Sequence, residues 1–482
     1  MTDVSRHVNF RRVAWENGFM DQIYAFNREY RPGVDVLRSR VAGLKRWNKS
    51  MNVSINPCPR IIRFFAFGNR PKSFAMNMKP LLIFCLAVLI SWTGYAAGDE
   101  TLLRRVADKV LADYRIAYTD RASGRTYASV DEIPAGARVR IASKYMDWHY
   151  SLGVLNMALL KMADRFGEER YADFVEQQID YALSVYDRFG VEEGEDHEPY
   201  HFLRKFNELD HCGAECAAMI ELMARRPEKT AAYMPFVTRA AEHIRRVQAR
   251  FPDGTLVRTW PYRHTLWADD LYMGLSFMSR YGSRFDDREM LRDAARQVER
   301  FHHYLWDPVT ELLWHGYYGD LNRTAGAHWG RCNGWVMLAT CQLLDLLPAE
   351  LCRPVLDLLE RQIAGVAKRQ AASGLWRQVL DREDSYEEGS CSAIFVYCVA
   401  HAVCEGWIDS RYATVALRGW EGLRREKITP EGELRDVCVG TGIGTDLPFY
   451  YNRPKVDGET HGTGLLLEAG MEILRLNDKL QK

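Results

Sequence analysis

From residue 101 onward, apolar side chains recur at positions i, i+3, i+4 and i+7, and stretches that alternate between apolar and polar residues are few. The first spacing is that of one face of an α-helix, whereas alternation would indicate β-strands. The pattern therefore predicts a nearly all-helical chain. We expect twelve helices, at approximately residues 101–115, 147–165, 169–187, 211–226, 230–249, 269–282, 287–304, 331–346, 348–368, 388–405, 409–423 and 462–477.

The predicted helices alternate in character. One set is amphipathic with charged faces, which is typical of outer helices: 169–187, 230–249, 287–304, 348–368 and 409–423. The interleaved set is less charged, and its members begin with glycine, aromatic and polar residues close together, as at Asp147-Trp148-His149-Tyr150 and His328-Trp329-Gly330-Arg331. A helix that is polar only at its start is expected to be buried along its length.

Six inner helices surrounded by six outer ones predict an all-α fold, the (α/α)6 barrel of six helical hairpins, with its site at one end. An open solenoid of helical repeats would give similar periodicity, but its loops would be regular. Here the loops range from two or three residues to about 38, between Arg424 and His461. We therefore predict one closed domain over residues 98–482.

Residues suited to sugar binding gather at the predicted open end. They are carboxylates (Asp147, Asp210, Asp269, Asp270, Glu387, Glu388), cations (Arg331, Arg377), histidines (His211, His264, His315, His328, His461) and indoles (Trp148, Trp267, Trp329, Trp335). Indole faces stack on the C–H faces of sugar rings, and carboxylates and arginine bind hydroxyl groups. This combination favours a carbohydrate ligand.

Each of these residues also has a purely structural interpretation. Asp210 and Asp269 stand at helix starts, where aspartate is a favoured N-cap. Arg331 could pair with a structural carboxylate, and tryptophan is more often a core residue than a sugar platform. What favours a site is that Trp, His and Arg recur with the acids at the starts of alternate helices, which capping does not explain.

Composition and motifs exclude several functions. Lys plus Arg and Asp plus Glu number 64 each, so the chain lacks the basic field that nucleic acid requires. Gly440-Thr441-Gly442-Ile443-Gly444 is followed by no helix whose N-terminus could hold phosphate, and no cofactor motif is present. Cys212 and Cys216 lack a second pair that would complete a zinc site. We expect no cofactor, no metal and no nucleic-acid partner.

The N-terminal region differs from the rest. Residues 1–77 hold 14 Lys and Arg against 5 Asp and Glu, whereas residues 78–482 hold 50 against 59. Met78-Lys79-Pro80 leads into the apolar run 81–90 and a Gly-Tyr-Ala-Ala exit, which is the pattern of an export signal cleaved after Ala96 or Ala97. We interpret 78–97 as a signal peptide and 1–77 as an upstream extension that is not native. The alternative is a basic regulatory extension followed by an uncleaved anchor.

Several motifs resemble glycoside hydrolase family 105, the unsaturated rhamnogalacturonyl hydrolases, which are related to the unsaturated glucuronyl hydrolases of family 88. In order along the chain they are Thr265 to Met273 (TLWADDLYM), His328-Trp329-Gly330-Arg331 with Asn333-Gly334-Trp335, Ser373 to Val379 (SGLWRQV), Ser385-Tyr386-Glu387-Glu388 with Ser390, and the Gly440 to Gly444 loop through Arg453-Pro454 to His461-Gly462-Thr463-Gly464. The resemblance covers roughly residues 101–480 and implies the same six-hairpin barrel.

The resemblance also implies a reaction. Family members remove a terminal uronic acid with a C4–C5 double bond, which a polysaccharide lyase leaves behind. A carboxylic acid protonates C4, water adds at C5, and the hemiketal opens and expels the aglycone. By resemblance Asp269 is the acid that also activates water, and Asp210 is the second catalytic carboxylate.

Further site residues follow from the same resemblance. His315, Arg331 and Trp335 are similar to positions that hold the uronate ring and its carboxylate, and Trp148 and Tyr150 to aromatic positions that line the pocket. Arg258 stands where relatives carry a histidine, so the exact substrate is open, and we expect Arg258 itself to contact substrate. We also expect substrate contacts from the remaining polar and aromatic residues near the helix starts: His211, His328, Trp376 and His461.

Three other functions remain open from the sequence. An inverting glycosidase on this barrel would need an acid and a base about 6.5 to 9.5 Å apart. A polysaccharide lyase would create a double bond rather than remove one. A catalytically inactive sugar-binding protein would not need Asp210 and Asp269 together. The expected partner is an unsaturated uronate oligosaccharide, and we expect a periplasmic or secreted protein that has no membrane segment after signal cleavage.

Overall fold

The computed structural model describes residues 98–190 and 198–481. The predicted extension 1–77 and export signal 78–97 lie outside the described residues. The chain divides into two units, residues 1–80 and 81–482, and everything described here belongs to the second. Within the described ranges, no helix combines the length and apolar character needed to cross a membrane.

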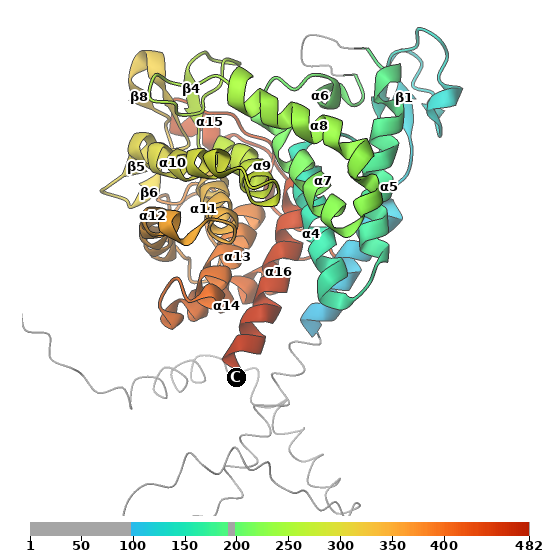
Figure 1. The fold of residues 1–482 in the computed structure, drawn as a ribbon. Helices are drawn as coiled ribbons and strands as arrows, with labels where there is room; N and C mark the ends of the chain where they lie inside the picture. The colour runs from blue at the N-terminus through green and yellow to red at the C-terminus, as the bar shows by residue number, and fades with distance from the viewer. Residues whose placement is uncertain (1–97, 191–197, 482) are drawn as a thin grey trace, which may run out of the picture. The chain divides into compact units, whose positions relative to one another are not determined.

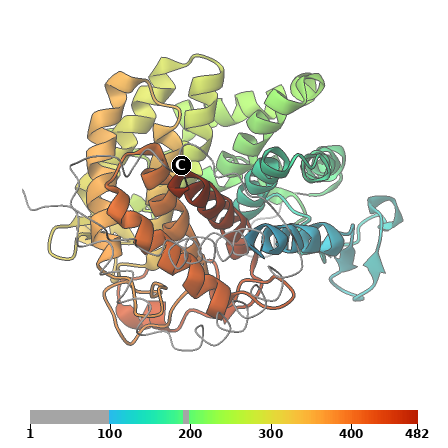
Figure 2. The same ribbon diagram turned by 90° about the horizontal axis from the view of Figure 1, so that it is seen from below.

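Six helices form a closed inner ring (Figures 1 and 2). Each of them packs against the next, and the last returns to the first. In order they are α4 (Tyr150–Phe166), α7 (Gly213–Arg225), α9 (Asp270–Arg284), α11 (Gly330–Leu344), α13 (Gly389–Glu405) and α16 (Thr460–Leu480). All residues of α11 are buried, and so are all residues of α13 except its last, Glu405, as expected of helices that other elements surround.

Outer helices cover this ring. They are α5 (Arg170–Val185), α8 (Thr230–Glu242), α10 (Arg288–Leu305), α12 (Ala349–Ala367), α14 (Ala413–Gly422) and a helix over residues 98–113. The last of these reaches α16, because Leu103 lies against Gly470. The all-α class, the twelve helices and the (α/α)6 barrel predicted from the sequence are confirmed.

Close backbone contact holds inner neighbours together. Gly213, the first residue of α7, lies against α9 so tightly that a Cβ atom there would be 1.6 Å from the carbonyl oxygen of Met273. Interiors this dense do not accept an added methyl group without backbone movement. The contact fixes the start of α7 beside the first turn of α9. In sequence, Asp210 lies just before α7 and Asp269 just before α9.

Short strands and turns that periodicity did not predict connect the helices. The strands are β1 (Tyr118–Asp120), β2 (Thr126–Tyr127), β3 (Val139–Ile141), β4 (Thr265–Trp267), β5 (Trp306–Asp307), β6 (Leu312–Leu313), β7 (Gly316–Tyr318), β8 (Arg323–Thr324), β9 (Val437–Cys438) and β10 (Lys455–Val456). They form antiparallel sheets in the orders β2-β1-β3, β4-β7-β8, β5-β6 and β10-β9. Two short helices are α6 (His201–Arg204) and α15 (Leu447–Tyr451). In Figure 1, β4, β8 and α15 lie at the end opposite the C-terminus.

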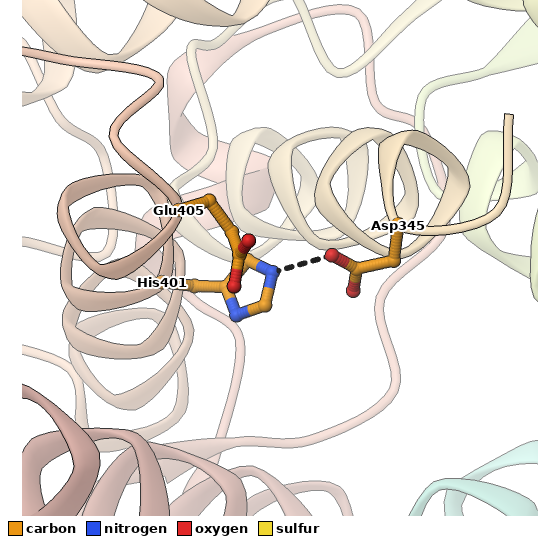
Figure 3. A group of neighbouring side chains, drawn as sticks. All are labelled: Asp345, His401 and Glu405. Carbon is orange, nitrogen blue, oxygen red and sulfur yellow. Dashed lines mark hydrogen bonds and ion pairs between the residues drawn. The ribbon is translucent and has the colours of Figure 1, made fainter. Parts of the chain in front are cut away.

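Near the other end of the inner helices, α11, α13 and α16 share a charged cluster. His401 lies 2.9 Å from a carboxylate oxygen of Asp345 (Figure 3). It also lies 3.2 Å from a carboxylate oxygen of Glu472. Arg475 pairs with Glu472 and Glu405. Oxygen and nitrogen atoms of Asp345, His401 and Glu405 come within 4.8 Å of one another, a spacing that suits a metal ion. In this cluster, however, His401 and Arg475 already supply the positive charge.

The charge of His401 ties stability to pH. Burial opposes protonation of His401, but its bonds to Asp345 and Glu472 outweigh burial and raise the pKa to about 10. A raised pKa in the folded state stabilises the fold fully below the ordinary histidine pKa of about 6.5, and this contribution disappears as the pH rises through about 10.

We therefore predict that His401→Gln lowers the free energy of unfolding by about 2 kcal/mol at pH 6 and by much less at pH 10. Thermal melts of wild type and variant across this range measure the difference. His303→Gln is the matched control, because His303 is exposed on α10. A His401→Gln deficit that stays constant from pH 6 to pH 10 would contradict the charged cluster.

Candidate active site

Asp269 is held by a histidine and not by the helix that follows it. It directly precedes α9, but its carboxylate makes no capping bond to the described first turn of that helix. Instead Oδ2 lies 3.0 Å from Nε2 of His315, a fully buried residue just before β7. The capping interpretation of Asp269 is therefore wrong. The side chain is 13% exposed, so a ligand can still reach it.

A tyrosine continues this chain of hydrogen bonds. Nδ1 of His315 lies 3.0 Å from the hydroxyl of Tyr450, on α15, and that hydroxyl accepts a bond from the backbone N–H of Gly444 at 3.1 Å. The nearer acceptor for the proton of that hydroxyl is Nδ1 of His315, because the carbonyl of Gly444 lies 3.4 Å away. With Nδ1 as the acceptor, Nε2–H of His315 donates to Asp269. Burial raises the pKa of Tyr450, which keeps this proton in place.

Asp210 is anchored by Arg258. It lies within the short 3-10 turn Leu209–His211 and caps neither that turn nor α7, so here too the capping interpretation is wrong. Nη2 of Arg258 is 3.1 and 3.0 Å from the two Asp210 oxygens. The same guanidinium binds Asp270, with contacts from 2.6 to 3.1 Å, and donates to Glu208 at 3.3 Å.

The Arg258 cluster is nearly sealed from solvent. Arg258 is 7% exposed and lies 4.2 Å above the ring of Trp267, and Asp270 is 1% exposed. Burial raises the pKa of Asp270 to about 6, against the opposing charge of Arg258. Burial likewise raises the pKa of Glu208 to about 7. The guanidinium therefore serves several carboxylates at once.

Tyr150, the first residue of α4, lies among the predicted site residues. After burial, the charges that most affect its pKa are those of Asp210 and Asp269, which raise it, and of Arg331, which lowers it. Charges act this strongly only at short range inside a protein. The structure thus brings Tyr150, Asp210, Asp269 and Arg331 together. Trp335 contacts Tyr150 edge to face at 6.4 Å.

His461 connects this group to α16. Nε2 of His461 is hydrogen-bonded to the Tyr150 hydroxyl, and Nδ1 to the carboxylate of Glu459, which caps α16. Burial opposes ionisation of Glu459, but the bond and charge of His461 outweigh it and lower the pKa of Glu459 to about 2. His461 therefore donates to Glu459 and accepts from Tyr150 when it is neutral.

The glycine-rich loop 440–444 runs along the same residues. A Cβ atom on Gly442 would lie 3.0 Å from the Trp267 ring, and one on Gly440 would lie 3.8 Å from the His461 ring. The loop therefore contacts the site from Trp267 to His461, and glycine lets its backbone approach the two rings closely. This structural role replaces the nucleotide-loop interpretation, which the sequence already rejected.

Arg331 is buried and mostly occupied. It stacks on Trp329 at 4.5 Å and donates to Ser390 and to the backbone carbonyls of Cys438 and Val439. Glu388 lies 3.9 Å away, so a structural carboxylate is present, but it is not the main partner. Nε of Arg331 is buried, and among the described groups none accepts from it.

Other predicted residues have partners elsewhere. Trp148 donates to the carbonyl of His211, and His211 stacks on Phe202 at 4.0 Å, so both support the wall next to Asp210. Burial lowers the pKa of His211 to about 3, so it is neutral. His328 stacks on Trp314 and pairs with Asp307 and Asp381. Trp376 donates to the carbonyl of Val366 and is fully buried. The structure does not bring His328 or Trp376 into contact with Asp269.

Three residues with direct contacts to this group were not assigned from the sequence. They are Glu208, Tyr450 and Glu459. Glu459 carried a usable signal, because it precedes α16 by one residue and acids favour that position. Tyr450 stands in the apolar run 447–451, where it could not be distinguished from a core residue.

Comparison with known proteins identifies the family of this chain. A sequence model described as Glycosyl Hydrolase Family 88 matches residues 121–477, and the chain therefore belongs to this family. It is 28% identical over 258 residues to the unsaturated rhamnogalacturonyl hydrolase YesR of Bacillus subtilis, which is 52% of this chain and 72% of YesR. It is also 31% identical over 232 residues to Protein Atu3128 of Agrobacterium fabrum, covering 42% of this chain and 99% of that protein.

Solved structures show the same fold. A crystal structure of a possible member of the GH105 family from Klebsiella pneumoniae matches with a TM-score of 0.67 and 21% identity, over 88% of this chain and 99% of that one. At this identity the likeness establishes the barrel alone. The resemblance to families 105 and 88 that the motifs indicated is confirmed by the sequence comparisons.

The hydrogen-bond directions at His315 can be tested without a substrate. We predict that ¹⁵N chemical shifts of wild type show His315 neutral, with its proton on Nε2, and that Tyr450→Phe changes the Nδ1 shift because it removes that donor. His315→Gln identifies the signal. Protonation of Nδ1 in the wild type at pH 7 would show that the chain of donors runs the other way.

Proposed function

We propose that this protein is a hydrolase that removes a terminal 4,5-unsaturated uronic acid from oligosaccharides produced by polysaccharide lyases. The observation that carries the proposal is the placement of Asp269, which is bonded to buried His315 and lies, with Asp210, within electrostatic reach of Tyr150. Membership of family 88 and the similarity to YesR, an unsaturated rhamnogalacturonyl hydrolase, support the same activity.

In this proposal Asp269 is the general acid. It gives its proton to C4 of the enol ether, and water adds at C5 with the help of the same carboxylate. The resulting hemiketal opens and the aglycone leaves. His315 fixes which Asp269 oxygen is free, because Nε2–H occupies Oδ2. A general acid must be held within hydrogen-bond reach of the atom that it protonates.

Asp210 is the second carboxylate of the mechanism. Its two oxygens face Nη2 of Arg258, and these charge-assisted contacts fix the orientation of the carboxylate. A negative charge next to the forming oxocarbenium-like centre stabilises it. Arg331 and Trp335 are proposed to hold the carboxylate and the ring of the uronate.

The identity of the aglycone and of the parent polysaccharide stays open. The alternative functions differ in their effect on the ultraviolet absorbance of the unsaturated uronate. An inverting glycosidase would act on saturated glycosides, and a lyase would create ultraviolet absorbance. A binding protein would change nothing. Only hydration of the double bond removes the absorbance of the unsaturated uronate.

We predict that residues 98–482 remove this absorbance from at least one unsaturated disaccharide in a panel of lyase products. Asp269→Asn should lower the rate by roughly a thousandfold and Asp210→Asn by about a hundredfold, because each removes a group used in proton transfer or charge stabilisation. Asp286→Asn is the control, since Asp286 is exposed and far in sequence from both acids. Full activity of Asp269→Asn, or no activity of folded wild type on any substrate, would contradict the proposal.

We also propose that the protein is exported, with translation from Met78. The support is the signal-like stretch 78–97 and the change from basic to acidic composition at residue 78. N-terminal sequencing of the native protein should begin at residue 97 or 98, and cell fractionation should find it in the periplasm or the medium. A native N-terminus at Met1 would contradict this assignment.

A further inference from the structure

Arg258 occupies an unusual position among the site residues, because one guanidinium serves three carboxylates. Its nitrogens lie 3.0 to 3.1 Å from Asp210, 2.6 to 3.1 Å from Asp270 and 3.3 Å from Glu208. The planar fork of arginine fits such bidentate pairs, whereas lysine offers a single point charge. With only 7% of Arg258 exposed, solvent screens these pairs weakly.

The backbone fixes Arg258 relative to the proposed acid. Arg258 N–H donates to the carbonyl of Thr265 at 2.7 Å, and Thr265 N–H donates back at 3.3 Å. Thr265 begins β4, which carries Trp267 and leads directly into Asp269. Trp267 donates through Nε1 to the Thr265 hydroxyl at 3.0 Å and stacks on Arg258. One short hairpin therefore positions both Asp269 and the cation that binds Asp210.

We infer that Arg258 is the positioning residue of this site, and that its guanidinium keeps Asp210 ionised and oriented by joining it to Asp270 and Glu208. This inference rests on the proposed function. On this inference Arg258 does not contact substrate, because its six contacts to acids engage the guanidinium, five of them through Nη2 or Nε. The raised pKa values of Glu208 and Asp270 agree with three carboxylates that share one cation.

Charged and titratable groups face Asp210 from each neighbouring element. They are Tyr150 on α4, Asp270 at the start of α9 with Asp269 directly before it, Arg258 on the hairpin, and Glu208 and Cys212 on its own segment, with His211 next to Asp210 in sequence. Arg258 is the one cation in this set, since the low pKa of His211 leaves it neutral. Without Arg258, several carboxylates would compete for a proton near neutral pH, as like charges do at short range.

The first experiment measures the pH dependence of kcat/KM for wild type, Arg258→Gln and Asp270→Asn. We expect Arg258→Gln to move the acid limb of the profile, where kcat/KM falls as the pH drops, to higher pH by about one unit or more. The loss of kcat/KM relative to wild type should then be about tenfold larger at pH 6 than at pH 8. Asp270→Asn removes a competing carboxylate and should move the limb to lower pH. Arg258→Lys keeps the charge and should keep the limb, but it should lower kcat.

The control is Arg280→Gln. Arg280 is also 7% exposed and binds Glu221, Ser276 and Gln342 within the barrel. It removes a buried arginine without touching the Asp210 cluster, so the acid limb should stay where it is in wild type. An acid limb that is the same in wild type, Arg258→Gln and Asp270→Asn would overturn the inference, because a merely structural arginine lowers activity equally at every pH.

A second measurement needs no substrate and so separates this inference from the proposed function. Carboxylates that lose Arg258 are destabilising when ionised, so the melting temperature of Arg258→Gln should fall further below wild type as the pH rises from 5 to 8. If wild type is inactive on every unsaturated substrate but this trend is present, the proposed function fails and the inference about the ion pairs of Arg258 stands. A difference in melting temperature that does not change with pH overturns that inference.

Discussion

The burial of the inner helices on all sides determines where chemistry is possible in this molecule. A helix such as α11, with every residue buried, has room for polar groups only where they find partners or where the helix begins. Because the inner helices follow one another around a closed ring, their starts come together at one end. Asp210, Asp269, Arg331 and His461 belong to four different starts, and this convergence makes a site from residues far apart in sequence.

Hydrogen bonding then decides what these residues do. Asp269 turns away from α9 toward His315, and His315 is oriented in turn by Tyr450. Asp210 is bound by Arg258 instead of capping a helix. Two carboxylates of the same type thus receive different partners, Asp269 an imidazole and Asp210 a permanent cation. Different partners for two similar acids are how an enzyme separates a proton donor from an ionised neighbour.

Periodicity predicted the architecture well, because apolar spacing reports directly on burial. It located all twelve helices, and the alternation of charge distinguished inner from outer ones. It did not predict β4 or β7, since strands of two or three residues are too short for a period to show. These strands matter, because they connect Arg258 and His315 to the start of α9.

The residue types of the site were also readable from the sequence, but their partners were not. Aspartate before a helix predicts a cap, and only the fold shows that His315 competes for Asp269. Arg258 looked like a substrate contact because its three carboxylates come from two separate segments. Trp376 looked like a sugar platform, and its place between α12 and α13 depends on packing that sequence does not contain.

The central claim is that Asp269 delivers its proton to the double bond and not to the glycosidic oxygen. A crystal structure of the Asp269→Asn protein with an unsaturated disaccharide tests it most directly. The account predicts that C4 of the uronate lies about 3 to 3.5 Å from the substituted side chain, with the uronate carboxylate at Arg331. A complex in which that side chain contacts the glycosidic oxygen, with C4 out of reach, would contradict it.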